Sequence, residues 1–234
     1  TSATSPANAA DMTQERAQNV AKEPQNWLLH HGNYQGHRFS QLKDINTDSV
    51  KNLKMAFGVA LGGFESGGRY KFGNLEGTPL VEDGFMYITD GWNNGYKVDV
   101  RSGNAGYIVW KWNSDMDRAY AAASGCCQRK NRGNAMIENL IIQSTQDGRM
   151  VALDKDSGQV VWQVKTADNE LMESHTGAPL VFKNFALFGQ GTLNFTDRFR
   201  GIVGIRYTTD QLDVFHRRDT TLAGRPASCA TCTP

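Results

Sequence analysis

The chain has 234 residues, and its 25 lysine and arginine side chains nearly balance its 24 aspartate and glutamate side chains, for a formal net charge of +1. With no run of like charges, this balance excludes a surface built for nucleic acid or another polyanion. No apolar run approaches the roughly 18 residues that a membrane-spanning helix needs. The 24 glycines and the 10% aromatic content favour a β-rich fold with many tight turns.

The N-terminal segment is small and polar, and Ala7-Asn8-Ala9 has the A-x-A form of a signal-peptidase site. We interpret it as the end of a removed export signal, the alternative being a chance match in an alanine-rich tail. Export would place the protein where disulfides persist. Residues 1–25 are therefore predicted to be a polar segment after the signal, helical or disordered over 11–25.

The ordered part of the chain is expected to begin near Trp27. A short helix should follow, capped by Asn46 or Thr47, because either side chain can accept hydrogen bonds from the first helical turn. Residues 55–61 alternate between larger and smaller side chains, which predicts a strand. Residues 62–68 form a glycine-rich loop.

A repeat occupies most of the remaining chain. Asp99 and Asp154 occupy matching positions in it, 55 residues apart. The repeated units cover residues 78–110, 140–162 and, in degraded form, 178–215. A unit of this length is typical of a propeller, in which each small antiparallel sheet buries its faces against its neighbours.

The first two units each contain a turn followed by a tryptophan, of which Asp154-x-x-Ser157-Gly158-x-x-x-Trp162 is the clearest case. Asp154 can accept backbone hydrogen bonds within the turn, and Ser157-Gly158 supplies the turn geometry. Trp162 can lie in the groove between neighbouring sheets. We interpret these residues as scaffold.

Cys126 and Cys127 are adjacent. Consecutive Cα atoms lie about 3.8 Å apart, whereas ordinary disulfides prefer roughly 4.4–6.8 Å. A bond between the two would therefore close a strained ring, and such strain gathers at functional sites. The alternative is a pair of unrelated thiols in a core, since free cysteine packs as a small hydrophobic residue.

The repeat pattern decays after Arg206, and residues 207–234 lack strand alternation, which predicts an atypical C-terminal tail. Cys229 and Cys232 form a C-x-x-C pair there. A c-type haem site would need histidine where Thr233 stands, and one such pair cannot complete a zinc site. We hypothesise that this tail reflects a truncation or a change of reading frame.

Four motifs carry a resemblance to a known family. They are Trp27…Arg38-Phe39-Ser40…Ile45-Asn46…Asn52-Leu53, Leu75-Glu76-Gly77-Thr78-Pro79-Leu80, Cys126-Cys127-x-x-x-Asn131-Arg132-Gly133 and Ala152-x-Asp154-x-x-Ser157-Gly158-x-x-x-Trp162. Together they resemble the PQQ-dependent (quinoprotein) alcohol and methanol dehydrogenases. The resemblance implies an all-β fold: an eight-bladed β-propeller of four-stranded blades with tryptophan docking motifs. This chain, over a partial propeller at residues 26–206, would cover about three blades.

The resemblance also implies the residues that bind pyrroloquinoline quinone (PQQ). A Cys126–Cys127 disulfide would form one wall against the flat quinone. Arg132 would pair with a PQQ carboxylate, Glu76 would hydrogen-bond the cofactor, and Thr176 would donate its hydroxyl to another carboxylate. Their structural alternatives are a turn cap for Glu76, a solvated surface position for Arg132 and strand packing for Thr176.

The family's metal-binding glutamate has no counterpart in the glycine-rich loop at residues 189–201. Asp197 and Asn194 are the remaining oxygen ligands there for Ca²⁺ or a lanthanide, and Asp197 is favoured because of its charge. The resemblance places the aspartate expected as general base, and the second stacking wall, beyond this chain.

The function implied is oxidation of an alcohol in the periplasm, with electrons passed to a cytochrome c-type acceptor. The alternative is a non-catalytic propeller segment that acts as a scaffold or interaction module. Because unclosed blades expose strand edges and apolar surface, we expect the isolated chain to be marginally stable or to form homo-oligomers.

Overall fold

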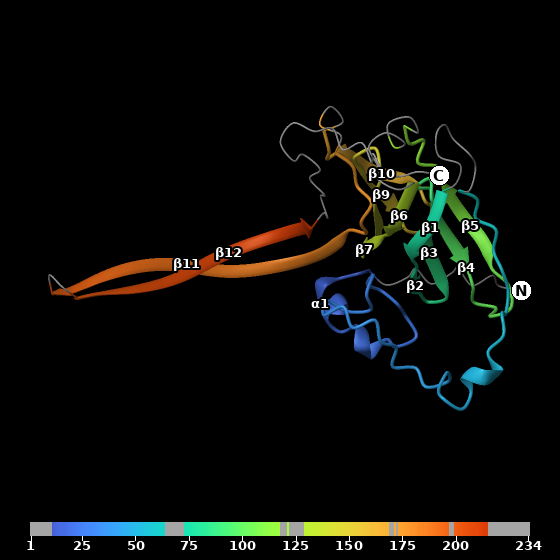
Figure 1. The fold of residues 1–234 in the computed structure, drawn as a ribbon, viewed down its shortest axis with the longest axis horizontal. Coiled ribbons are helices and arrows are strands. Elements are labelled where there is room, and N and C mark those ends of the chain that lie inside the picture. The colour runs from blue at the N-terminus through green and yellow to red at the C-terminus, as the bar shows by residue number, and fades with distance from the viewer. Residues whose placement is uncertain are drawn as a thin grey trace, which may run out of the picture. The chain divides into compact units, whose positions relative to one another are not determined.

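Two four-stranded antiparallel sheets dominate the computed structural model (Figure 1). The structure describes residues 11–63, 73–117, 121, 129–168, 171, 173–196 and 199–214, with the backbone alone over 182–214. The first sheet contains β2 (Leu80–Glu82), β3 (Phe85–Thr89), β4 (Gly95–Asp99) and β5 (Tyr107–Trp112). The second contains β7 (Ala135–Ile137), β8 (Leu140–Ser144), β9 (Arg149–Asp154) and β10 (Val160–Lys165). In each sheet consecutive strands are neighbours, which is the form of a propeller blade.

The repeated turn is built as the sequence predicts. Asp154 ends β9, and its Oδ1 accepts hydrogen bonds from the backbone nitrogens of Asp156 at 3.2 Å and Ser157 at 2.7 Å. Gly158 follows with a φ of +71°, a conformation that side chains with a Cβ rarely adopt. Asp99 ends β4 in the first blade. The scaffold interpretation of the turn is confirmed, whereas Trp162 is 39% exposed and its docking stays a prediction.

The tryptophans of the two blades occupy equivalent places. Trp110 pairs with Lys97, two residues before Asp99, and Trp162 pairs with Ala152, two residues before Asp154. The connection in the first blade is longer, yet both tryptophans pair at the same place, and each ladder carries a register shift beside its tryptophan.

Trp110 docks the first blade onto the second. Its indole Nε1 donates a hydrogen bond to the carbonyl oxygen of Lys155 at 3.1 Å. A Cβ added to Gly158 would lie 2.6 Å from the indole, so only glycine allows this approach. The core around it draws on both blades and on the N-terminal segment. Its buried residues are Met12, Ala17, Leu28, Leu29, Leu80, Tyr87, Trp110, Met136, Ile141, Val151 and Leu153.

The N-terminal segment contains α1 (Gln14–Gln18) and η1 (Val20–Lys22). Thr13 caps α1, since its Oγ1 accepts a hydrogen bond from the Arg16 nitrogen at 3.1 Å. Helical structure within residues 11–25 was one of the two expectations for this segment.

A buried ion network joins this segment to both blades. Glu82 of β2 pairs with Lys155 in the turn after β9, with 2.7 Å between Oε2 and Nζ, and neither side chain is exposed. Arg16 of α1 pairs with the other oxygen of Glu82 and, at 2.6 Å, with Glu23. The three elements are thus held by one carboxylate.

The expected short helix is a 3₁₀-helix, η2 (Val50–Asn52). Asn46 caps the turn leading into it, because its Oδ1 accepts hydrogen bonds from the nitrogens of Asp48 and Ser49, both at 3.0 Å. The N-cap position of η2 itself is Ser49, without a capping side-chain hydrogen bond, so neither Asn46 nor Thr47 caps the helix as predicted.

The strand predicted at residues 55–61 is wrong. The segment is extended and alternates in exposure, but it forms no ladder. Val59 and Leu61 instead pack on the buried side chains of the first blade, and Tyr96 donates its hydroxyl to the Leu61 carbonyl oxygen at 2.7 Å. The alternation therefore records contact with a sheet face, not membership of a sheet.

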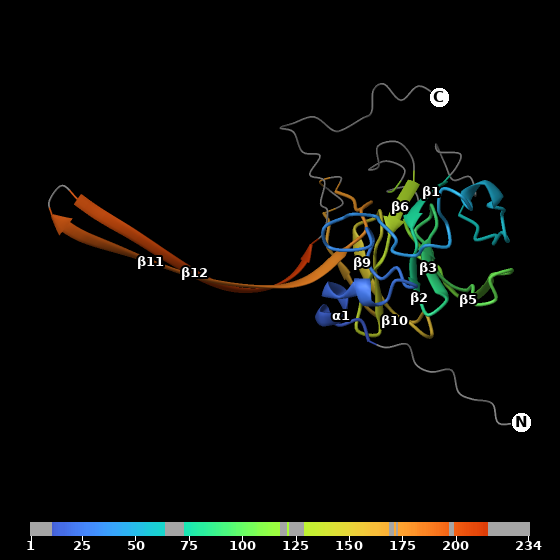
Figure 2. The same cartoon turned by 90° about the horizontal axis from the view of Figure 1, so that it is seen from below.

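Two further strands form a parallel pair. β1 (Gly73–Thr78) and β6 (Arg129–Gly133) lie side by side (Figure 1 and Figure 2). They are far apart in the sequence, and the pair brings together two of the motifs quoted above.

Residues 180–214 form a separate compact unit, a long antiparallel hairpin of β11 (Leu180–Thr196) and β12 (Phe199–Val214). It corresponds to the third, degraded unit of the repeat. β12 continues past Arg206, where the propeller segment was predicted to end, and that boundary stays a prediction. None of the helices in the described ranges has the length and apolarity needed to cross a membrane.

Candidate cofactor-binding site

The parallel pair of β1 and β6 places Glu76 beside Arg132. The ladder is irregular between Leu75 and Thr78, so Glu76 lies within the irregularity. Such departures from regular pairing redirect side chains and are common beside functional sites. Two motifs that are more than 50 residues apart in the sequence thereby share one site.

Glycines allow this close approach. A Cβ added to Gly77 would lie 2.8 Å from Oγ1 of Thr89. Gly133 has a φ of +132°, and a Cβ there would lie 2.9 Å from the Thr78 carbonyl oxygen. A larger residue at Gly133 would separate the strands that carry Glu76 and Arg132, and one at Gly77 would push β1 away from Thr89 at the end of β3.

Arg132 binds Thr176 directly. Its Nη1 donates a hydrogen bond to Oγ1 of Thr176 at 2.6 Å and lies 3.3 Å from the carbonyl oxygen of the same residue. The Arg132 backbone nitrogen donates to that carbonyl oxygen at 3.1 Å. Nε of Arg132 lies 3.9 Å from Oε2 of Glu76. Glu76, Arg132 and Thr176, predicted from separate motifs, therefore lie together.

The arrangement suits an anionic ligand. The Arg132 side chain is 43% exposed and that of Glu76 is 34% exposed, so the two do not neutralise each other in a buried ion pair and both remain accessible to a ligand. Thr176 fixes one edge of the guanidinium plane. Within the described part of the chain, Nη2 of Arg132 makes no hydrogen bond, so it can meet an incoming carboxylate in the planar geometry that arginine favours.

The remaining predicted site residues are not placed. Cys126, Cys127 and Asp197 lie outside the described residues, and Asn194 lies in β11 with its backbone alone described. The disulfide and the metal ligands therefore stay predictions. Among the residues that are described, no three His, Cys, Asp or Glu side chains are grouped so that they could hold a metal ion.

Sequence reasoning missed the polar residues behind the site. His175 precedes Thr176, is 3% exposed, and its Nε2 lies 2.8 Å from Oγ1 of Thr166. Burial lowers the pKa of His175 below its usual range. Asn131 precedes Arg132 and is fully buried. The only signal in the sequence was their position next to motif residues.

His30 lies on the other side of β6. A Cβ added to Gly133 would lie 3.2 Å from its Nδ1, and that buried nitrogen makes no hydrogen bond within the described structure. Burial, followed by the neighbouring His31 and Arg38, lowers the pKa of His30 from 6.5 to about 4.

Acid should therefore destabilise the protein through His30. Between pH 6.5 and about 4 the unfolded chain binds a proton at this ring that the folded chain rejects, so the free energy of unfolding falls as the pH falls. We expect His30→Gln to reduce this loss in urea titrations across that range. Identical pH dependence in the wild type and His30→Gln would contradict the assignment.

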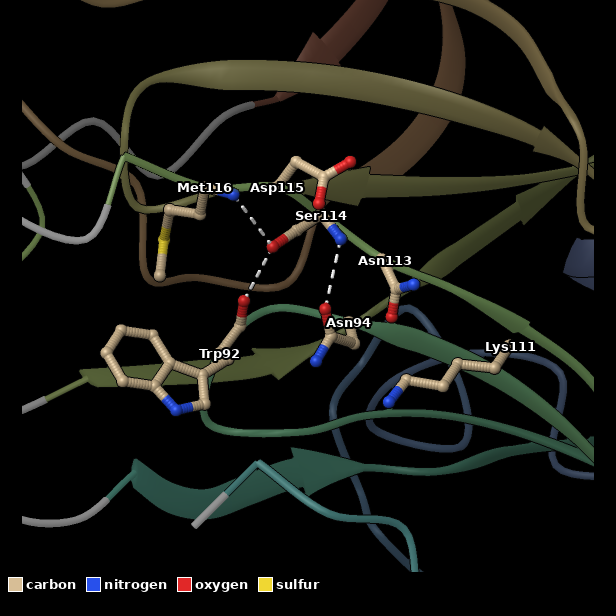
Figure 3. A pocket seen from close by; sticks show the side chains of 7 residues that line it. All are labelled: Trp92, Asn94, Lys111, Asn113, Ser114, Asp115 and Met116. Carbon is tan, nitrogen blue, oxygen red and sulfur yellow. Dashed lines mark hydrogen bonds between the residues drawn. The ribbon is translucent and has the colours of Figure 1, made fainter. Parts of the chain in front are cut away.

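A separate pocket of about 370 Å³ lies between the β3–β4 connection and the residues that end and follow β5 (Figure 3). Ser114 donates its hydroxyl to the Trp92 carbonyl oxygen at 2.7 Å and its backbone nitrogen to Oδ1 of Asn94 at 3.0 Å. These polar groups thus satisfy one another. Of the predicted site residues whose side chains the structure describes, Glu76, Arg132 and Thr176, none lines this pocket.

Residues 27–166 match the PQQ family model described as "Glucose/ethanol/alcohol dehydrogenase, beta-propeller domain". The fold and the site agree with this match, and the chain belongs to this family. The resemblance and the propeller fold expected from the sequence are confirmed.

Similar proteins are alcohol and methanol dehydrogenases. The chain is 34% identical over 73% of its length to the lanthanide-dependent methanol dehydrogenase of Methylacidiphilum fumariolicum (strain SolV), covering 26% of it. It is 34% identical over 70% of its length to the quinohemoprotein alcohol dehydrogenase ADH IIB of Pseudomonas putida, covering 22%. A solved europium-containing methanol dehydrogenase superposes with a TM-score of 0.65 at 28% identity, over 87% of this chain and 33% of that one. The chain thus spans about a quarter of the length of the curated relatives it matches.

Proposed function

We propose that the protein binds PQQ and takes part in PQQ-dependent oxidation of an alcohol. The observation that carries the proposal is the convergence of Glu76, Arg132 and Thr176 on one partly exposed site. When bound, PQQ accepts the electrons removed from the alcohol. The residues of this chain bind and orient the acidic cofactor.

The residues present fit PQQ. Arg132 offers a planar cation to a carboxylate, and its orientation is set by the hydrogen bond to Thr176. The Thr176 hydroxyl accepts from Arg132 and so remains able to donate its own proton to a second carboxylate oxygen. Glu76, with the Asn74 amide 3.3 Å from its Oε1, accepts a hydrogen bond from a donor on the cofactor. Arg132 offsets the repulsion between this carboxylate and the acidic ligand.

The finer features belong to the same proposal. Cys126 and Cys127 form a disulfide wall against the quinone, and Asp197 with Asn194 contributes to a site for Ca²⁺ or a lanthanide. The protein acts in the periplasm and passes electrons to a cytochrome c-type acceptor. The relatives named as quinohemoproteins and as lanthanide-dependent support this chemistry.

Titration of the purified protein with PQQ, followed by quenching of tryptophan fluorescence, tests the proposal. We expect saturable binding at one site, tighter with Ca²⁺ or La³⁺ present and weaker after reduction of the disulfide. A dye-linked assay with added alcohol then measures turnover. Absence of saturable PQQ binding by the folded protein would contradict the proposal. Binding without turnover would favour the alternative, a non-catalytic propeller segment.

A further inference from the structure

A buried asparagine stands behind the site at the point where its three parts meet. Asn131 lies in β6 between the strands of the two blades and has no exposed surface. Its neighbour Arg132 faces the site. Burial of a side-chain amide costs folding free energy unless its donor and acceptor are both hydrogen-bonded. The hydrogen-bond partners of Asn131 therefore show which segments it holds in place.

The Asn131 amide binds both blades and its own strand. Nδ2 donates a hydrogen bond to the Ser144 carbonyl oxygen at the end of β8, at 2.7 Å. Oδ1 accepts from the hydroxyl of Thr89, at the end of β3, at 3.2 Å and from the Gly133 nitrogen at 2.9 Å. The amide thereby fixes both flanks of Arg132.

Two of these partners reach the other site residues. Ser144 donates its hydroxyl to the Gly177 carbonyl oxygen at 2.8 Å, immediately after Thr176. Gly77 immediately follows Glu76, and the Thr89 hydroxyl lies so close to it that a Cβ on Gly77 would clash with that hydroxyl. Glu76, Arg132 and Thr176 are thus each adjacent in sequence to a glycine that Asn131, Thr89 or Ser144 contacts.

We propose that Asn131 is a positioning residue that sets the mutual placement of Glu76, Arg132 and Thr176 for the anionic ligand. The inference rests on the proposed function for the identity of that ligand. It acts through the backbone: Nδ2 holds Ser144, Ser144 holds the 176–177 segment, and that segment accepts the hydrogen bond from the Arg132 nitrogen.

Asn131→Asp replaces the donor with an oxygen that faces the Ser144 carbonyl, keeps the size and the acceptor, and adds a charge, so Ser144→Ala, which adds none, is measured beside it. We expect the amide hydrogen of Arg132 to exchange about tenfold faster in the ligand-free protein, and the Kd for PQQ to rise about tenfold. The amide of Val81, which donates to the Trp27 carbonyl oxygen elsewhere in the first blade, reports any general loss of stability.

Asn139→Asp is the matched control. Its Nδ2 donates to Oδ2 of Asp154 at 2.9 Å in the scaffold turn, so it loses a comparable bond away from the site. We expect the Arg132 amide and the PQQ affinity to keep their wild-type values there. If Asn131→Asp does not fold, Ser144→Ala breaks the same chain at the Gly177 bond and should accelerate Arg132 exchange in the same way.

The outcomes separate the two proposals. Faster exchange at Arg132 but not at Val81 supports the positioning role, even if the wild type fails to bind PQQ and the proposed function falls. Equal acceleration at both amides, or PQQ affinity unchanged in folded Asn131→Asp when the wild type binds, overturns the positioning role and leaves a purely structural one.

Discussion

Replacement of Glu82 by glutamine is expected to lower the free energy of unfolding by about 3–5 kcal/mol. Glu82 and Lys155 are fully buried and paired at 2.7 Å, so removal of one charge leaves the other in the protein interior without compensation. Arg16 loses a partner at the same time. Because a domain's total stability is typically only about 5–15 kcal/mol, this change takes a large share of it.

Urea unfolding followed by tryptophan fluorescence measures the effect, and a double-mutant cycle isolates the pair. We expect Lys155→Met to be destabilising alone, and the combination with Glu82→Gln to cost less than the two single changes added together. Arg101→Gln is the control, because Arg101 is 57% exposed in its pair with Asp99 and its loss should leave the free energy of unfolding close to the wild-type value. An equally small effect of Glu82→Gln would contradict the argument.

The blade architecture was predictable because its signals are local. Asp154, Ser157 and Gly158 bond within one turn, so residue type and spacing alone determine the geometry. The same turn recurs at Asp99, which set the period of the repeat. The docking role was predicted for Trp162 from its place after the turn, and the structure shows it for the equivalent Trp110 of the first blade.

Contacts between distant segments were not predictable in the same way. Glu82 and Lys155 belong to different units of the repeat, and nothing near either residue indicates that the other neutralises it. The extended segment containing Val59 and Leu61 shows the opposite failure: its alternation was real, but periodicity cannot distinguish a strand from a chain packed across a sheet face.

In the candidate site, too, the residues in local motifs were predictable and those defined by contacts between distant segments were not. Glu76, Arg132 and Thr176 were found because family motifs carry them, and the structure brings the three together. Asn131 stood inside a quoted motif without a role, because its function depends on bonds to Thr89 and Ser144 that only the folded chain creates. The geometry therefore adds the support behind the residues that the motifs had already indicated.

Loss of the Arg132 guanidinium should weaken PQQ binding more than any other single change in the site. A hydrogen bond to a charged group is worth roughly 1.5–3 kcal/mol, so Arg132→Gln is expected to raise the Kd for PQQ about 10- to 100-fold. Arg132→Lys retains the charge but loses the planar fork, and we expect it to recover only part of the affinity. Both variants should fold, because the side chain is 43% exposed.

Arg101→Gln separates a specific contact from a general loss of positive charge. Arg101 also pairs with a carboxylate, that of Asp99 at 2.6 Å, but in the turn after β4. We expect fluorescence titrations of Arg101→Gln to match the wild type. If both arginine variants weaken binding equally, PQQ responds only to net charge. If neither does, Arg132 does not contact the cofactor, and the convergence with Glu76 and Thr176 serves the fold alone.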